Sequence, residues 1–360
     1  MQPGRGSVYR SYAGCRAALV FAYPCSKRSY TAGRLRYHDV SFPQYNYGTE
    51  RSRKFTFKLN ENVKRTELRF KNCFGIELAA DLYFPKNIEK KKSSALVIGG
   101  PFGAVKEQAS GFYANEMAAL GFVTLAFDGS YTGESGGIPR HVASPDISTE
   151  DFMAAVDELG LQPNVDRERI GMIGLCGWGG FALNAASIDK RVKAVITVSM
   201  YNISAMGDVP TAERTTTLNA LANQRWIDAE NRTNTPGADR FPNGYPENEP
   251  DEGKNVYNYY RTERGFHENS ILSNSTWNAT MPLSFMATKI MQYIDEISPR
   301  PILLIAGDKA LTKPHTDWAY EHAKEPKELY VVKDAGHATL YDQKDKIPFQ
   351  KINDFFNQHL

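Results

Sequence analysis

Three residues with reactive side chains, Cys176, Asp308 and His337, each follow a short apolar run of this 360-residue chain. A thiol, a carboxylate and an imidazole in this chain order can act together, because the imidazole takes the thiol proton and the carboxylate orients the imidazole. The resulting thiolate attacks a carbonyl carbon. The sequence therefore predicts acyl chemistry with Cys176 as nucleophile, His337 as base and Asp308 as acid.

Cys176 lies in the segment Gly174-Leu-Cys-Gly-Trp-Gly-Gly180, between an apolar run and an Ala-rich stretch. Small residues around an apex allow a strand to turn sharply into a helix, whose dipole favours a thiolate at its N-terminus. The pattern is close to the nucleophile elbow G-x-S-x-G, except that Cys replaces Ser and Trp178 stands where a glycine is usual. The alternative interpretation is an unreactive, buried cysteine in a glycine-rich turn.

Acyl transfer also needs two backbone N–H donors for the oxyanion. We expect one from Gly177, which follows the nucleophile, and the other from the loop Gly99-Gly-Pro-Phe-Gly103. Pro101 has no N–H, so Phe102 is the preferred second donor.

Two further groups of residues are assigned roles by their positions. Trp178 and Tyr201 are predicted to line the substrate pocket, and His141 and His267 are additional candidates for it. Asp128 and Glu134 follow another apolar run and are the alternative triad acids. We favour a loop-fixing role for them, because Asp308 follows the strand at which the acid is more usual.

The elements that must position these residues alternate between apolar strands and amphipathic helices. Strands are expected at 95–98, 122–127, 170–175, 192–198, 301–305 and 329–332, and helices at 108–120, 147–159, 181–188, 316–323 and 349–360. This alternation predicts an α/β fold, with a mostly parallel sheet covered by helices on both faces. Earlier runs at 53–59, 64–70 and 76–84 read as strands, the last two forming an antiparallel hairpin.

The chain divides into four segments on composition and pattern. Residues 1–38 form a basic segment, 39–60 an irregular extension, and 61–201 with 300–360 the α/β core. Residues 202–299 interrupt the core and are partly helical, at 212–225 and 282–297. An insertion of this length between two core strands is predicted to be a helical cap over the ligand-binding ends of the strands.

The basic segment predicts targeting. It carries seven basic residues and no acidic one, and it is rich in Arg, Ser, Tyr and Ala. This composition is typical of a mitochondrial transit peptide, and Arg28-Ser-Tyr30 resembles a presequence cleavage context. A secretory signal, or a disordered tail on a cytoplasmic protein, is the alternative.

Two of the four cysteines, Cys15 and Cys25, lie in this segment, so the rest of the chain has no disulfide framework.

The charge of residues 39–360 limits the classes of partner that we expect. The net charge of these residues is −5, so they lack the excess of basic side chains that is typical of nucleic-acid-binding proteins. No apolar run reaches the length of a membrane span. No pair of cysteines has metal-ligand spacing, and the predicted chemistry needs neither a metal nor another cofactor. A small-molecule acyl substrate is the expected partner, and the oligomeric state stays open.

These residues resemble the α/β-hydrolase fold and, within it, the cysteine-nucleophile branch typified by dienelactone hydrolases. The resemblance is greater to bacterial-type α/β hydrolases related to that branch and extends over about residues 60–360. The segments that carry it are 100–108, 122–128, 133–137, 174–180, 299–305 and 342–347. It implies Cys176 as nucleophile, His337 as base and Asp308 as acid. Related sequences often have an acid directly after the strand that ends near Met200, where this chain has Asn202.

The expected function is hydrolysis of an ester, thioester or lactone through an acyl-enzyme on Cys176. Two alternatives stay open: an acyltransferase or polyketide-type transferase with the same triad, and a catalytically silent relative that acts as a binding protein. The insertion at 202–299 is larger than in dienelactone hydrolases proper. Their lactone substrate is therefore not transferred to this protein.

Overall fold

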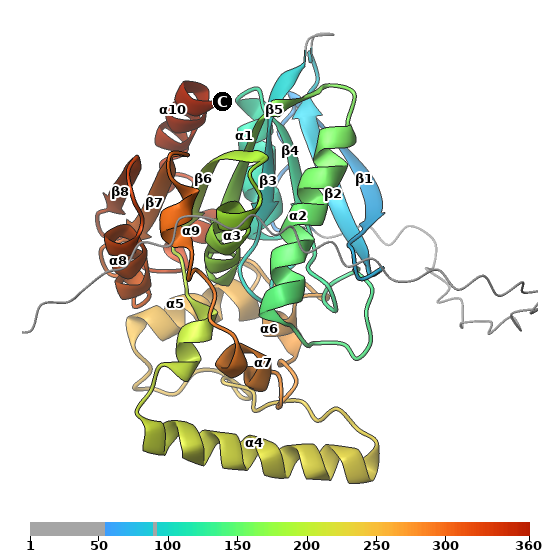
Figure 1. Ribbon diagram of the computed structural model, residues 1–360, viewed down its shortest axis with the longest axis vertical. Coiled ribbons are helices and arrows are strands. Elements are labelled where there is room, and N and C mark those ends of the chain that lie inside the picture. The colour runs from blue at the N-terminus through green and yellow to red at the C-terminus, as the bar shows by residue number, and fades with distance from the viewer. Residues whose placement is uncertain (1–54, 89–91) are drawn as a thin grey trace, which may run out of the picture. The chain divides into compact units, whose positions relative to one another are not determined.

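An eight-stranded sheet forms the centre of the computed structural model, which describes residues 55–88 and 92–360 (Figure 1). The strands follow the order β1-β2-β4-β3-β5-β6-β7-β8. Their bounds are β1 (Val63–Lys71), β2 (Glu77–Pro85), β3 (Ser93–Gly99), β4 (Val123–Phe127), β5 (Val165–Leu175), β6 (Val192–Val198), β7 (Ile302–Gly307) and β8 (Lys327–Val332). The segment 1–38, predicted to be a targeting signal, and residues 39–54 of the predicted extension lie outside the described residues.

The sheet is parallel except at its N-terminal side. β2 pairs antiparallel with both β1 and β4, and every pairing from β4 through β3 to β8 is parallel. Strands β3, β4 and β7 are almost continuously buried, as expected when helices cover both faces. The predicted α/β-hydrolase fold, with its N-terminal antiparallel hairpin, is confirmed.

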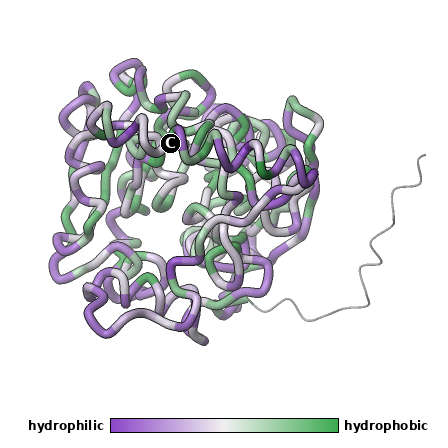
Figure 2. Tube along the Cα trace, turned by 90° about the horizontal axis from the view of Figure 1, so that it is seen from below, coloured by the Kyte–Doolittle hydropathy of each residue, from purple (hydrophilic) through white to green (hydrophobic). Residues whose placement is uncertain are grey.

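Helices cover the two faces of the sheet. On one face α2 (Pro145–Leu161), α3 (Gly177–Ile188) and α8 (Lys313–His322) contribute to one hydrophobic cluster. On the other, α1 (Ala109–Ala119) and α10 (Phe349–His359) contribute to a second cluster. Hydrophilic segments predominate at the periphery of this body (Figure 2).

The chain between β6 and β7, residues 202–299, is called the cap below. It contains two 3₁₀ turns, η1 (Ile203–Gly207) and η2 (Ile294–Ile297), and the helices α4 (Thr211–Asn231), α5 (Asp251–Arg261), α6 (Ile271–Asn274) and α7 (Pro282–Ala287). Figure 1 shows these helices gathered at one end of the sheet, with α4 outermost. None of the helices in the described ranges is both long and apolar enough to cross a bilayer.

Two expected elements differ from the structure. The strand predicted at 53–59 is absent over residues 55–59, where Phe57 instead packs its ring 6.0 Å from that of Phe112 on α1. The helix predicted at 282–297 is broken into α7 and η2. In both places side-chain packing outweighs the local pattern.

Candidate active site

Cys176 occupies the turn between β5 and α3. Its backbone has φ 54° and ψ −125°, a strained conformation for a residue with a side chain. The turn is held by the Cys176 N–H, which donates to the Val198 carbonyl at 3.0 Å. The Cys176 carbonyl accepts the N–H groups of Gly179 and Tyr201, each at 2.9 Å. The elbow therefore fixes the thiol at the N-terminus of α3.

Two N–H groups flank the sulfur. Gly177 is the first residue of α3, and the backbone N–H groups of a helix's first turn have no partner within the helix. A Cβ at Gly177 would lie 2.8 Å from the Cβ of Phe102, so the glycine lets the loop after β3 approach the helix. The Phe102 N–H contacts the Cys176 sulfur. Gly177 and Phe102, the expected oxyanion donors, therefore both lie beside Cys176.

The cap holds the Phe102 loop from the opposite side. The Phe102 ring stacks on Trp277, with centroids 4.1 Å apart and planes at 17°. The Gly103 carbonyl accepts the Ser270 hydroxyl at 3.0 Å and the Ile271 N–H at 2.9 Å. The loop that carries Phe102, the expected second oxyanion donor, is therefore held by cap residues.

His337, after β8, is buried and adjoins Cys176. Its Nε2 lies 2.8 Å from the hydroxyl of Tyr341, and its Nδ1 lies 2.5 Å from Oγ1 of Thr312. Both ring nitrogens therefore face a hydroxyl group, which can donate or accept a hydrogen bond. The base is oriented without a carboxylate bonded to its ring.

The surroundings of Cys176 favour its thiolate. Burial raises the pKa of the thiol, but the charge of His337 and hydrogen bonds from His337, Tyr341 and the Phe102 N–H together lower this pKa below its ordinary value of 9.0. The pKa of the exposed Cys73 is instead raised, by desolvation and by a hydrogen bond with Glu150. Because the thiolate is the nucleophile, Cys176 is the more activated of these two thiols.

Asp308 is not brought to His337. Its side chain is exposed, and its Oδ1 accepts the Ala335 N–H at 3.3 Å. The chain continues the ladder beyond β7, where the Lys309 N–H donates to the Ala335 carbonyl, and this pairing directs Asp308 away from the imidazole. Thr312, four residues later at the start of α8, occupies the place at Nδ1 that was predicted for the acid.

The two predicted pocket residues lie in different surroundings. Trp178 is buried in the core, with its ring centroid 5.1 Å from Phe127 and 5.2 Å from Phe152. Its bulk fills the space between α3, α2 and β4. Tyr201 is half-buried, and the charge of Cys176 contributes, after burial, to raising its pKa. Of the two, Tyr201 is the one beside the nucleophile.

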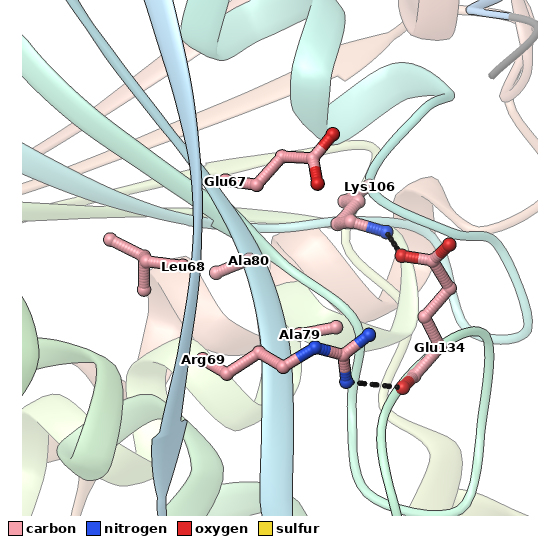
Figure 3. Close-up of a pocket in the computed structure, with 7 residues that line it drawn as sticks. All are labelled: Glu67, Leu68, Arg69, Ala79, Ala80, Lys106 and Glu134. Atoms are coloured by element: carbon pink, nitrogen blue, oxygen red, sulfur yellow. Dashed lines mark hydrogen bonds and ion pairs between the residues drawn. The ribbon is translucent and has the colours of Figure 1, made fainter. Parts of the chain in front are cut away.

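Asp128 and Glu134 belong to a buried ionic cluster around Lys106. The Lys106 Nζ lies 3.3 Å from Asp128 and 2.6 Å from Glu107. It also lies 2.8 Å from Glu134, an ion pair drawn in Figure 3. The Lys106 N–H also donates to Asp128 at 2.7 Å. The cluster anchors the loop that carries Phe102, which agrees with the loop-fixing role favoured above.

Burial and close charges shift the pKa values of the groups in this ionic cluster. Burial and the neighbouring Asp128 raise the pKa of Glu107 to about 7. Burial opposes the charge of Lys106, but the four carboxylates of Asp128, Glu107, Glu134 and Asp81 outweigh it and raise the Lys106 pKa. The cavity beside the cluster is lined by strand residues of β1 and β2, together with Lys106 and Glu134 (Figure 3). It is separate from Cys176.

The cap also fastens the loop that carries the base. Glu252 of α5 accepts the His337 backbone N–H at 2.9 Å. Arg264 pairs with Asp342 at 2.6 Å and donates to the Ala338 carbonyl at 2.7 Å. Cap residues thus contact both the oxyanion loop and the histidine loop. His141 and His267 bond to Ser275 and to the Asn269 N–H respectively, within or beside the cap.

Sequence reasoning missed three residues at or near the site: Thr312, Tyr341 and Lys106. Tyr341 follows His337 by four residues, a spacing that places both on one side of a turn, and this was the available signal. Thr312 and Lys106 carried no comparable signal. Among the described residues no three His, Cys, Asp or Glu side chains are grouped so as to hold a metal ion.

Comparison with known proteins places the chain in a family. The family model described as X-Pro dipeptidyl-peptidase (S15 family) matches residues 75–282. The chain belongs to the S15 family. This S15-family protein has the α/β-hydrolase fold and is an enzyme of the hydrolase type.

Three relatives of this S15-family protein bear on its chemistry. A hypothetical protein from Pseudomonas aeruginosa is 52% identical, and its crystal structure covers 85% of this chain and 96% of its own, with a TM-score of 0.82. A Penicillium polyketide transferase is 26% identical over 83% of this chain and 98% of its own. Its crystal structure, with a TM-score of 0.69, shows the same fold. A thiohydrolase from Aspergillus aculeatus is 36% identical over 39% of this chain and 43% of its own.

Proposed function

We propose that this protein is a cysteine-dependent hydrolase or acyltransferase that acts on an ester, thioester or lactone. The observation that carries the proposal is the placement of the Cys176 sulfur between His337 and the Phe102 N–H, at the start of α3. A nucleophile, a base and an oxyanion donor converge there, as acyl transfer demands. The dienelactone-hydrolase-like character of the sequence supports the same chemistry.

The proposed reaction has two halves. His337 receives the thiol proton, and the Cys176 thiolate attacks the carbonyl carbon. The N–H groups of Gly177 and Phe102 stabilise the oxyanion, and the leaving alcohol or thiol takes the proton from His337. Water or another acceptor then gives a proton to His337, attacks the acyl-enzyme and releases the thiolate. Thr312 Oγ1 holds the imidazole throughout.

The acceptor distinguishes the two versions of the proposal. The thiohydrolase relative favours water, whereas the polyketide transferase relative favours a carbon, alcohol or amine nucleophile. Product analysis by mass spectrometry, with and without an added alcohol or amine, separates them. Free acid alone supports hydrolysis, and an acylated acceptor supports transfer.

Thiol labelling tests the proposal as a whole. At pH 7, iodoacetamide should modify Cys176 faster than Cys73, as read by peptide mapping. Cys176→Ala should abolish turnover of a panel of p-nitrophenyl esters and acyl thioesters, and the matched control Cys73→Ala should retain it. The proposal is wrong if Cys176 reacts no faster than Cys73 and no acyl substrate or activity-based probe modifies it.

A further inference from the structure

A tyrosine hydroxyl contacts both members of the proposed nucleophile–base pair. The Tyr341 hydroxyl lies 2.8 Å from His337 Nε2, and it is close enough to the Cys176 thiol for each group to affect the pKa of the other. The thiol and the imidazole therefore share one hydroxyl, which can accept a proton from one partner while donating its own to the other. A phenylalanine would fill the same space, so packing alone does not account for the Tyr341 hydroxyl beside His337 Nε2.

The Tyr341 side chain is held firmly. It is buried on the short helix α9 (Thr339–Asp342), and its ring packs against His337 and Tyr259, with centroids 5.4 and 5.0 Å away. The neighbouring Leu340 carbonyl accepts the Tyr113 hydroxyl at 2.7 Å. Arg264 of the cap pairs with the adjacent Asp342. The core and the cap thus fix α9 from two directions.

A second buried phenol adjoins this hydroxyl. The Tyr260 hydroxyl is buried and has no hydrogen-bond partner within ordinary limits among the described residues, and both Cys176 and Tyr341 are close enough to affect its pKa. Burial and the charge of Cys176 keep the pKa of Tyr341 well above 10, so its hydroxyl retains a proton at neutral pH. Tyr341 is therefore a carrier that stays neutral before and after a transfer.

We propose that Tyr341 is a further catalytic residue, which relays the proton from the Cys176 thiol to His337 Nε2 and then donates a hydrogen bond to the thiolate. In the relay the S–H bond breaks as the thiol proton joins the Tyr341 oxygen. The original Tyr341 O–H bond breaks as its proton joins Nε2. The products are a Cys176 thiolate, a neutral Tyr341 and a His337 imidazolium, so atoms and charge balance. This inference rests on the proposed function of Cys176.

The test compares Tyr341→Phe with the matched control Tyr259→Phe. Both remove one buried hydroxyl from the same aromatic cluster, but Tyr259 has no hydrogen bond to the thiol or the imidazole. The readouts are the pH dependence of iodoacetamide modification at Cys176 and the kcat/KM for an acyl thioester. We expect Tyr341→Phe to lower both rates at pH 7 about tenfold or more and to move the alkylation midpoint to higher pH. Tyr259→Phe should match the wild type.

The outcomes are distinguishable. If Tyr341→Phe folds and keeps the wild-type alkylation profile and kcat/KM, Tyr341 is a packing residue and the inference is overturned. If the wild-type Cys176 is itself unreactive, the proposed function fails instead. If Tyr341→Phe does not fold, 3,5-difluorotyrosine at position 341 preserves the shape while making the hydroxyl more acidic. An unchanged alkylation profile in that protein also overturns the inference.

Discussion

Replacing Thr312 by Val removes the hydroxyl that faces His337 Nδ1 while keeping the shape of the side chain. That hydroxyl lies 2.5 Å from a ring that becomes positively charged in the proposed reaction. A hydrogen bond to a charged group contributes about 1.5–3 kcal/mol. Since about 1.4 kcal/mol corresponds to a tenfold change in rate, Thr312→Val should lower kcat/KM by about 10- to 150-fold. Thr312→Ser, which keeps the hydroxyl, should restore most of the activity.

The matched comparison is Asp308→Asn. Asp308 is exposed, and its Oδ1 accepts the Ala335 N–H at 3.3 Å, so its substitution should change kcat/KM by about twofold or less. The assay is steady-state hydrolysis of an acyl thioester, with melting temperatures measured on the same preparations. A loss of more than about 100-fold in Asp308→Asn, with Thr312→Val unaffected, would refute the reasoning. It would show that Asp308 orients the base after all.

Three other changes test separate parts of the structure. Lys106→Met removes the cation beside the buried carboxylates of Glu107 and Asp128, so urea unfolding should show a loss of about 3–5 kcal/mol, and an unchanged stability would argue against the ionic cluster. Trp178→Ala should cost about 3–5 kcal/mol by the same assay, while the reactivity of Cys176 per folded molecule stays unchanged, as befits a core residue. The alkylation rate of Cys176 should rise with pH to a plateau, with its midpoint below 9.0, because the thiolate forms above the lowered pKa. A midpoint at or above 9.0 would contradict the described surroundings of the sulfur.

The fold was predictable because its signals are local and repeated. Buried strands such as β6, Val192–Val198, are continuous apolar runs, and their alternation with helices leaves few possible topologies. The turn at Cys176 was also predictable from the sequence, since only small neighbours allow so sharp a turn. The glycine-rich loop after β3 and the position of His337 after its strand were predictable because they too are local sequence features.

The orientation of side chains after a strand end was not predictable. Asp308 follows β7 as the acid of such a site should, but one further pair of backbone hydrogen bonds directs it outward and leaves the place to Thr312. Trp178 stands next to the elbow in sequence, yet the helix turns its ring into the core. Such outcomes depend on how two loops pair or pack across space, and a residue type at a sequence position does not encode that.

Glu252, on the first turn of α5, accepts the backbone N–H of His337, the proposed base, and Trp277 stacks on Phe102, the proposed oxyanion donor. Access to the thiol and the reactivity of the thiol are therefore not independent properties of this protein. A change in the position of the cap would alter both contacts, and with them the backbone positions of Phe102 and His337 on either side of the thiol.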